Sequence, residues 1–186
     1  WLIKKNPKAS VVIGHDPRFA GALFAQTTAK VCCTKGIKVF LAKGFVSTPM
    51  ISLGTVNKKA DLGIIITASH NPPSYNGYKL KGSYGGPLIP SQVQEIEDII
   101  KDEATIDVEN ISLSDFEKSG LLEYVDLETM YCDHAAKNFD LDAIRNSGLK
   151  FAYDAMYGAG QNVIRRLLPQ TTMLHCDENP SFKGQA

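Results

Sequence analysis

The sequence predicts an α/β protein: a three-layer α/β/α unit with a mixed, mostly parallel sheet, followed by part of a second, similar α/β domain. Short apolar runs alternate along the chain with longer segments of helical spacing, which is typical of strands and helices in succession. The run at 61–68 is almost uninterrupted Ile and Leu, as in a strand buried on both faces under helices. A second series of strand, glycine turn and helix begins at residue 149.

The first unit is predicted to hold three parallel strands joined by two helices. The strands lie at 10–16, 37–44 and 61–68. The first helix ends at Gly36, and its apolar face consists of side chains at helical spacing: Phe19, Leu23, Phe24, Thr27 and Val31. The second helix covers 47–60, with Ser47 or Thr48 as its N-cap and Pro49 in its first turn, where proline is tolerated.

An edge strand and a further helix complete this unit. The segment 78–82 is expected to pair antiparallel at the edge of the sheet. The helix at 91–104 is capped by Ser91, and its apolar face consists of Val93, Ile96, Ile99 and Ile100. The acidic, irregular stretch 105–125 is interpreted as connecting chain with a short helix or strand, so the first domain is assigned to residues 1–125.

Residues 126–186 are assigned to linker helices and the truncated start of a second domain. The stretch 126–148 is predicted to be helical with a break near Asn138. A strand, a glycine turn and a helix follow over 149–170, and a second strand over 171–182. We therefore expect a sheet of two strands at most in this part.

Composition excludes several classes of protein. With 44% hydrophobic and 22% charged residues, the 186-residue chain is a soluble globular protein. Twenty Lys and Arg balance twenty Asp and Glu, so no overall field favours nucleic acid or an anionic membrane as a partner. The longest apolar runs are far shorter than the roughly 20 residues of a membrane span. The four cysteines show no C-x-x-C spacing, which favours reduced thiols in a cytoplasmic protein.

The stretch "IIITASHNPPSYNGYK", residues 64–79, places Ser69 at the exit of the most buried strand. Functional groups collect beyond the carboxyl ends of parallel strands in open α/β sheets. Two prolines after Asn71 stiffen the loop, and His70 supplies hydrogen-bonding groups beside the hydroxyl. The Asn-Gly turn at 76–77 returns the chain, so we expect Lys79 to lie beside the loop. The residues alone leave two interpretations open: an inert capped loop, or a hydroxyl presented for chemistry.

The segment "TASHNPPSYNGYK" resembles the active-site serine signature of the α-D-phosphohexomutases, the phosphoglucomutase and phosphomannomutase family, over the whole loop. Two other segments are similar to the same family. "VVIGHDPRF" resembles its first strand and Asp-X-Arg turn, and "FAYDAMYGAGQNVIRRLL" with "DENPSFKGQA" resembles the start of its second domain. The resemblance covers nearly the whole chain.

The resemblance implies roles for particular residues. Ser69 resembles the serine that is phosphorylated in the resting enzyme, and His70 its neighbour in the active-site loop. Lys79 resembles the lysine that assists proton transfer, and Arg18 the arginine near the phosphoserine. The implied reaction moves phosphate between O1 and O6 of a hexose phosphate, of glucose or mannose, through a bisphosphorylated sugar. Mg²⁺ and glucose 1,6-bisphosphate, or its mannose equivalent, are the implied cofactor and activator.

The sequence departs from the family pattern in what it lacks. It contains no Asp-Gly-Asp-X-Asp-Arg metal loop, no Gly-Glu-X-Ser-Gly sugar loop and no phosphate-binding segment of a last domain. In this chain Mg²⁺ would therefore be bound only through the phosphate on Ser69. The expected partners are a hexose phosphate and the rest of the same polypeptide, its domains II to IV, and the fragment alone is expected to be inactive. Phosphoglucosamine mutase and a non-catalytic phosphosugar-binding module, in which Ser69 is never phosphorylated, remain alternatives.

Two glycine-rich turns have simpler interpretations than ligand binding. The turn at 156–163 is favoured as close strand-to-helix packing over a phosphate cradle, and 82–87 as a hairpin turn. Asp154 is expected to cap the turn that follows it. His15 is interpreted either as a residue near the site or as a hydrogen-bonded structural histidine.

Overall fold

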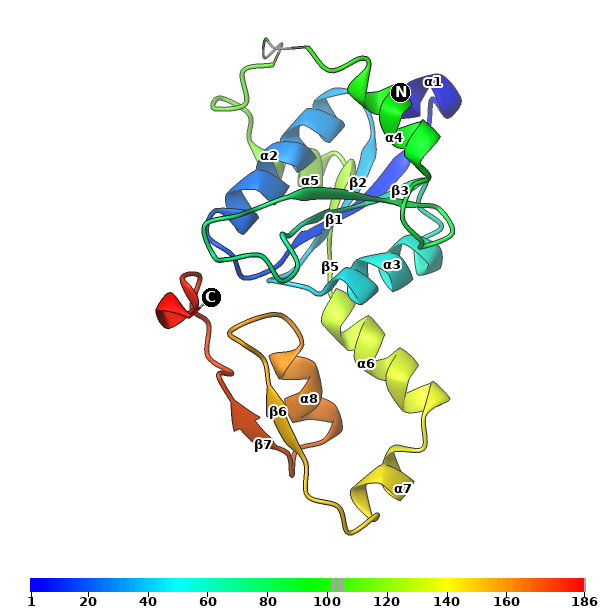
Figure 1. Cartoon of the computed structure of the whole chain (residues 1–186). Helices are drawn as coiled ribbons and strands as arrows, with labels where there is room; N and C mark the ends of the chain where they lie inside the picture. The colour runs from blue at the N-terminus through cyan, green and yellow to red at the C-terminus, as the bar shows by residue number, and fades with distance from the viewer. Residues whose placement is uncertain (102, 104–105, 186) are drawn as a thin grey trace.

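A five-stranded sheet forms the centre of the N-terminal unit, with the strand order β4-β3-β1-β2-β5 (Figure 1). The computed structural model describes residues 1–101, 103 and 106–185. The strands are β1 (Ser10–His15), β2 (Lys38–Ala42), β3 (Leu62–Ile66), β4 (Tyr78–Gly82) and β5 (Leu122–Val125). All neighbouring pairs are parallel except β3 and β4, which are antiparallel. The predicted mixed, mostly parallel sheet with an antiparallel edge strand is confirmed.

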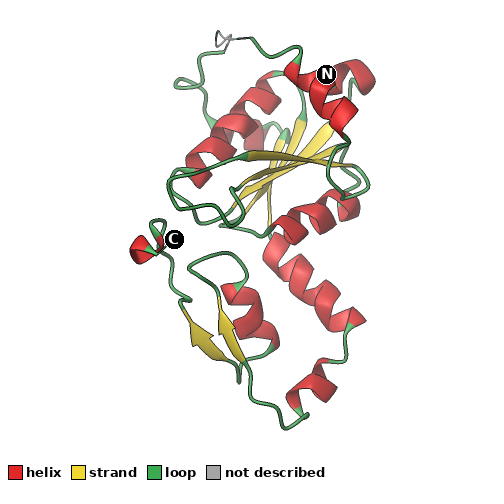
Figure 2. Ribbon diagram, in the orientation of Figure 1, coloured by secondary structure: helices red, strands yellow, loops and turns green. Residues whose placement is uncertain are grey.

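Helices cover both faces of this sheet and make it the middle of three layers (Figure 2). One face packs against α1 (Leu2–Lys5), α2 (Gly21–Thr34), α4 (Pro90–Glu97) and α5 (Leu113–Lys118). The other face packs against α3 (Thr48–Asn57) and the start of α6 (Leu127–Asn138). Since β3 lies between both layers, every residue from Leu62 to Ile66 is buried, which explains its unbroken apolar sequence.

The prediction of which face of α2 is buried is wrong. Phe19 and Leu23 are 78% and 61% exposed, and Phe24 and Val31 are exposed as well. The buried face of α2 is instead made of small side chains: Gly21, Ala25, Ala29 and Cys33. Small residues let the helix axis approach the sheet closely, so the packed face is not the one with the largest side chains.

The helix predicted at 91–104 begins one residue earlier and is shorter than expected. Pro90 occupies the first turn of α4 and Ile89 is the N-cap, so Ser91 does not cap the helix. The helix ends at Glu97, and Ile99 and Ile100 are exposed beyond it, while Val93 and Ile96 do pack on the core. Residues 102, 104 and 105 lie outside the described residues. The stretch expected to hold a short helix or strand holds both, α5 and β5.

The second unit, residues 126–185, contains a two-stranded parallel sheet of β6 (Ala152–Asp154) and β7 (Thr172–Leu174). Its other elements are α6, α7 (Leu141–Arg145), α8 (Gln161–Leu167) and the short 3₁₀ helix η1 (Phe182–Gly184). The predicted helix break lies between α6 and α7. Helix α6 packs against α3, and in Figure 1 it leads from the N-terminal unit into the second unit.

Two further observations concern the described part of the chain as a whole. All four cysteines are free, with Cys33 buried and Cys32 half-buried, so one of the adjacent pair packs inside as expected. Burial raises the pKa of the Cys32 thiol to about 12 and that of Cys33 to about 11, so neither is a reactive thiolate near neutral pH. None of the described helices has the length and apolar character needed to cross a membrane.

Candidate active site

The serine loop, residues 67–77, leaves the carboxyl end of β3 and returns into β4. Burial ends abruptly here, since Thr67 and Ala68 are buried whereas Ser69 and His70 are exposed. The backbone N–H of Thr67 donates to the carbonyl of Gly77 at 2.9 Å, which closes the base of the loop. Ser69 has a φ of 57°, in the left-handed region that is uncommon for residues other than glycine. Its neighbours must therefore hold this backbone in place.

Thr67 and Asp16 hold the backbone at Ser69. The N–H of Ser69 donates to Thr67 Oγ1 at 3.1 Å, and that hydroxyl donates to Asp16 Oδ2 at 2.5 Å. Asp16 lies at the end of β1, where its N–H donates to the carbonyl of Ile66 in β3 at 3.0 Å. Neighbouring parallel strands thus bring together the two residues that fix the backbone at Ser69.

Arg18 lies beneath the serine loop, with 4% of its surface exposed. Its Nε donates to Asp16 Oδ2 at 3.2 Å. Its two terminal nitrogens make four more bonds, of 2.7 to 3.0 Å, to backbone carbonyls of the loop: Ser69, Asn71, Pro72 and Tyr75. A guanidinium has five N–H groups, and these five hydrogen bonds give each of them a partner. Arg18 therefore binds the loop itself, and none of these donors is left over for a phosphate.

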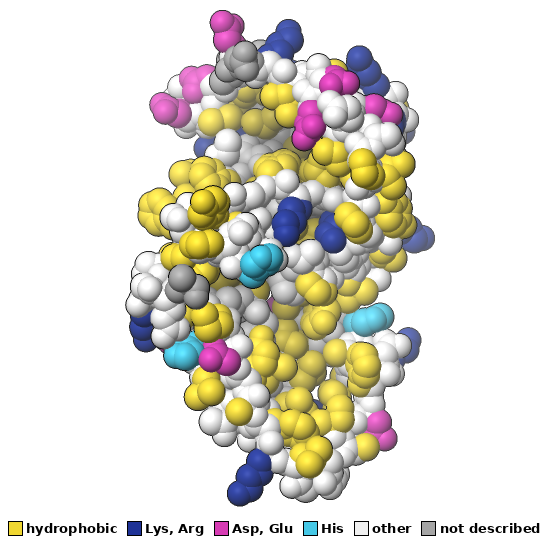
Figure 3. Space-filling model, in the orientation of Figure 1, with side chains coloured by type: hydrophobic (Ala, Val, Ile, Leu, Met, Phe, Trp, Pro, Cys, Tyr) yellow, Lys and Arg dark blue, Asp and Glu magenta, His cyan; other side chains and the backbone are white. Residues whose placement is uncertain are grey.

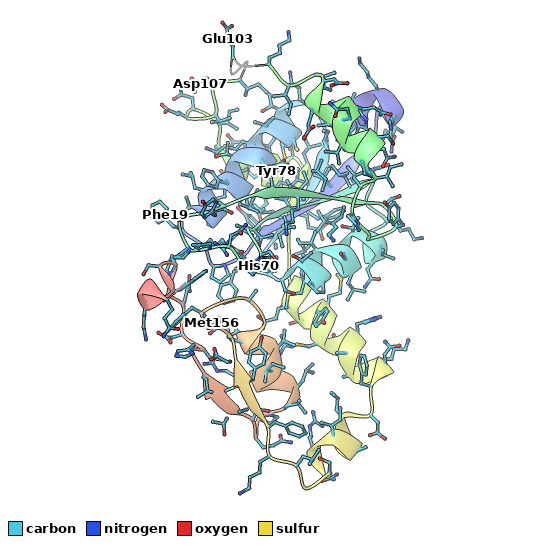
Figure 4. All side chains as sticks on the ribbon, viewed as in Figure 1. Phe19, His70, Tyr78, Glu103, Asp107 and Met156 are labelled. Carbon is cyan, nitrogen blue, oxygen red and sulfur yellow. The ribbon has the colours of Figure 1, made fainter. Side chains whose placement is uncertain are left out.

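Ser69 faces a cleft of about 450 Å³ between the N-terminal and second units. The cleft is lined on one side by the 16–18 turn, the start of α3 at 47–49 and loop residues Ser69, His70 and Asn71. The second unit contributes Ala155, Met156, Gly158, Ala159 and Phe182. Figure 4 shows His70 on the edge of the N-terminal unit nearest to Met156. A cleft of this size accommodates a sugar phosphate.

Lys79 is not among the residues that line this cleft. It lies in β4, where its register partner is Ile65, so its side chain shares a sheet face with a residue that does line the cleft. Lys79 is exposed. In Figure 3, Lys and Arg side chains lie close to a histidine on the surface of the N-terminal unit. The Asn-Gly turn returns the chain into β4 and places Lys79 opposite Ile65, which lines the cleft.

Asp154 at the end of β6 and His175 just after β7 form a carboxylate–imidazole pair in the second unit. Asp154 Oδ1 accepts the N–H of Met156 at 2.8 Å, as predicted for a capping residue, and Oδ2 contacts His175 Nδ1 at 2.8 Å. The Met156 N–H, and after it His175, lower the pKa of the Asp154 carboxyl below its usual value. Asp154 is thereby kept ionised as a turn-forming residue.

Among the described residues, no group of three or more His, Cys, Asp or Glu is arranged to bind a metal ion. The Asp16 carboxylate, which lines the same cleft as Ser69, is already bound by Arg18 and Thr67. The side chains of the described residues therefore do not form a magnesium site by themselves.

Three other features singled out in the sequence are His15 and the two glycine-rich turns. His15 Nδ1 donates to the Asp16 carbonyl at 2.8 Å, and the residue lines a different hollow from that of Ser69. The 82–87 segment is a tight turn, with the Gly82 N–H bound to the Gly86 carbonyl at 2.9 Å. The glycine turn before α8 lies close to Tyr153, with Gly160 at a φ of 105°, and it also lines the cleft through Met156, Gly158 and Ala159.

Sequence reasoning missed Thr67 and Phe182. The sequence pattern places Thr67 at the end of a buried strand, and only the register of β1 and β3 shows that its hydroxyl meets Asp16. Phe182 lies more than a hundred residues from the serine loop in sequence, yet its ring lies 5.1 Å from the Arg18 guanidinium carbon. An aromatic residue in a polar C-terminal stretch carries no signal that would predict this contact.

Comparison with known proteins finds relatives over both units of the chain. Residues 1–107 match the model for phosphoglucomutase/phosphomannomutase alpha/beta/alpha domain I, and residues 129–186 match that for alpha/beta/alpha domain II. The chain is 35% identical over 121 residues to a phosphoglucomutase of Staphylococcus saprophyticus, which covers 64% of this chain and 22% of the relative. It is 32% identical over 168 residues to a phosphoglucosamine mutase of Deinococcus radiodurans, covering 90% and 36%.

A solved structure from Thermus thermophilus, named as a phosphomannomutase, superimposes with a TM-score of 0.84 at 30% identity. That match covers 98% of this chain and 40% of the other. The chain thus spans between 22% and 36% of the length of the two curated relatives. Since the two domain models together match most of its residues, the chain belongs to the phosphoglucomutase/phosphomannomutase family.

Proposed function

We propose that this chain is the phosphoryl-carrying part of a phosphosugar mutase, in which Ser69 alternately donates and accepts a phosphoryl group. One observation carries the proposal: an exposed hydroxyl lies at the end of the most buried strand, on a backbone fixed by Thr67 and Arg18, and faces a cleft between two α/β units. Phosphoryl transfer depends mainly on alignment and charge stabilisation, so a rigidly placed hydroxyl is what the reaction requires.

The proposed reaction has two balanced steps. In the first, the bond between Ser69 Oγ and phosphorus breaks while a sugar hydroxyl oxygen, O6 of a hexose 1-phosphate, bonds to that phosphorus. The O6 proton passes to a base at the cleft, and the leaving Ser69 Oγ takes up a proton there. In the second step, after the bisphosphorylated sugar has turned around, Ser69 Oγ gives up that proton and attacks the other phosphate. The O1–phosphorus bond breaks and O1 takes up a proton, which leaves the 6-phosphate and the phosphorylated serine.

We propose roles for the surrounding groups. Arg18 keeps the loop carbonyls together and contributes its positive charge from beneath the loop. His70 lines the cleft beside Ser69, within its own loop. Lys79, opposite the cleft-lining Ile65, is proposed to assist proton transfer. Family membership supports Mg²⁺ as the cofactor, but its carboxylate ligands would have to come from outside this chain, because the described residues form no such group.

The substrate is proposed to be a hexose phosphate of glucose or mannose, with glucosamine phosphate as the alternative supported by the Deinococcus relative. The chain covers a minor part of its relatives, so we expect turnover from the full-length protein and negligible turnover from residues 1–186 alone.

The proposal is tested by phosphopeptide mass spectrometry and by turnover of the full-length protein. Phosphate should be found on Ser69, and Ser69→Ala should abolish mutase activity on glucose, mannose and glucosamine phosphates. Ser74→Ala is the matched control, since Ser74 is an exposed serine of the same loop that does not line the cleft. Unchanged turnover in Ser69→Ala would favour a phosphosugar-binding module over an enzyme.

A further inference from the structure

An aromatic side chain of the second unit reaches the serine loop from the opposite side of the cleft. Phe182 lines the cleft together with Ser69, and the Arg18 guanidinium carbon lies 5.1 Å from the centre of its ring. The five N–H groups of Arg18 are bound within the plane of the guanidinium. A further contact with Arg18 must therefore be made through the flat face of the guanidinium, and aromatic rings stack on such faces.

The turn that presents Phe182 is held by its own side chains. Asn179 Oδ1 accepts three hydrogen bonds: from the Ser181 N–H at 3.2 Å, the Ser181 hydroxyl at 2.8 Å and the Lys183 N–H at 3.0 Å. Lys183 also pairs with Asp177 at 2.9 Å and lies over the Tyr157 ring. The turn is therefore anchored to the second unit independently of its contact with Arg18.

The backbone of this turn is strained where the ring is presented. Phe182 has a φ of 53° and Lys183 a φ of 48°, both in the left-handed region that bulky side chains rarely adopt. Such a conformation persists only where surrounding contacts hold it, and it is concentrated at functional sites. Next to it, Pro180 and Ser181 share a shallow hollow with Tyr75 and other residues of the serine loop. The turn at 180–183 therefore lies next to the serine loop at several residues, and not only at Phe182.

We propose that Phe182 is a positioning residue for the serine loop. Its ring covers Arg18, keeps the guanidinium in the orientation that binds the loop carbonyls, and thereby makes the order of Ser69 depend on the second unit. The consequence for catalysis rests on the proposed function, whereas the effect on loop order does not. A cation–π contact between the buried Arg18 and the half-buried Phe182 ring implies a change of roughly 2- to 30-fold in the population of the ordered loop.

The first test measures hydrogen exchange of loop amides in the full-length protein. Phe182→Leu keeps an apolar side chain but removes the ring, and the Thr67 and Ser69 amides should then exchange roughly 2- to 30-fold faster. Phe139→Leu is the matched control, because Phe139 is an exposed phenylalanine of the same unit at the end of α6 and does not line the cleft. Equal exchange in wild type and Phe182→Leu, or equal acceleration in both variants, would overturn the proposal.

A second test does not depend on the leucine variant folding. Fluorinated phenylalanines at residue 182 preserve the shape of the ring while removing electron density from its face. Loop exchange should then increase stepwise with fluorination, and no dependence on fluorination would count against the contact with Arg18.

Kinetics separates positioning from substrate contact. A positioning role lowers kcat with little change in KM, whereas a wall that merely touches the sugar raises KM with kcat unchanged, which would overturn the assignment. If the wild-type protein turned over no sugar phosphate, the proposed function would fail, and the exchange measurements would still decide the role of Phe182.

Discussion

Replacing Thr67 by valine removes the hydroxyl that connects Ser69 to Asp16 while keeping the shape of the side chain. Thr67 is 4% exposed, so water does not replace the lost bonds. The bond to the Asp16 carboxylate contributes about 1.5–3 kcal/mol and the bond from the Ser69 N–H about 0.5–1.5 kcal/mol. Burial of the added methyl group offsets about 0.8 kcal/mol. The free energy of unfolding should therefore fall by roughly 1–3.5 kcal/mol.

The same change should slow the reaction, because Ser69 is no longer held at its backbone nitrogen. A displacement of about 1 Å at a reacting atom costs up to roughly 100-fold, so we expect kcat to fall about 10- to 100-fold. Stability is measured by urea unfolding, and kcat by coupled mutase turnover of the full-length protein.

The matched control is Thr55→Val. Thr55 is also fully buried, but its hydroxyl donates only to the Ile51 carbonyl within α3, at 2.7 Å. This neutral bond contributes about 0.5–1.5 kcal/mol, most of which the methyl group offsets, so both stability and kcat should stay close to wild type. The reasoning is refuted if Thr67→Val retains both quantities, or if Thr55→Val loses as much activity.

Two further predictions separate geometry from charge. Arg18→Lys keeps the positive charge but has only three donors for five acceptors, so at least two hydrogen bonds are lost. The free energy of unfolding should fall by about 2–4 kcal/mol, and not by more, because water can bind some of the exposed loop carbonyls. Urea unfolding and loop hydrogen exchange check this, and wild-type values for the lysine variant would mean that charge alone suffices. Asp126, the N-cap of α6, has its carboxyl pKa lowered below the usual value near 3.8 by the Thr129 N–H and then the Thr129 hydroxyl. A lowered folded-state pKa stabilises the protein above the unfolded pKa, and this stabilisation is lost as the pH falls through the folded pKa. The deficit of Asp126→Asn, about 0.3–1 kcal/mol at pH 7, should therefore shrink towards zero as the pH falls below 3.8. A deficit in urea unfolding that does not shrink on acidification would contradict this.

Local pattern was sufficient to predict most strands and the position of the serine. The unbroken apolar run of β3 indicates a central strand, and the polar residues after it mark the carboxyl edge of a parallel sheet, where Ser69 is found. The turn at Gly77 likewise predicts that β4 returns antiparallel. These features depend on residues close together in sequence.

What the sequence could not predict depends on pairs of elements. Helix α2 shows its largest side chains to solvent because Ala25 and Ala29 fit against the sheet, and hydrophobic size alone selects the wrong face. Figure 4 shows Phe19 pointing away from the core at the start of α2. The bond from Thr67 to Asp16 requires the register of β1 and β3, and the contact of Phe182 requires the placement of the second unit.

The arrangement around Ser69 uses backbone bonds for a physical reason. Under the proposed function the Ser69 hydroxyl accepts and releases a phosphoryl group, so strong bonds to its own oxygen would have to break in every cycle. Thr67 holds the backbone nitrogen of Ser69 and Arg18 its carbonyl, at 3.1 and 3.0 Å, which leaves the side chain free while fixing its origin. A cation whose donors are all used by the loop also cannot bind the phosphate too tightly for transfer. Under the proposed function, the charge that moves with the phosphate between serine and sugar is stabilised by other groups, and Lys79 is an exposed cation opposite Ile65, which lines the cleft.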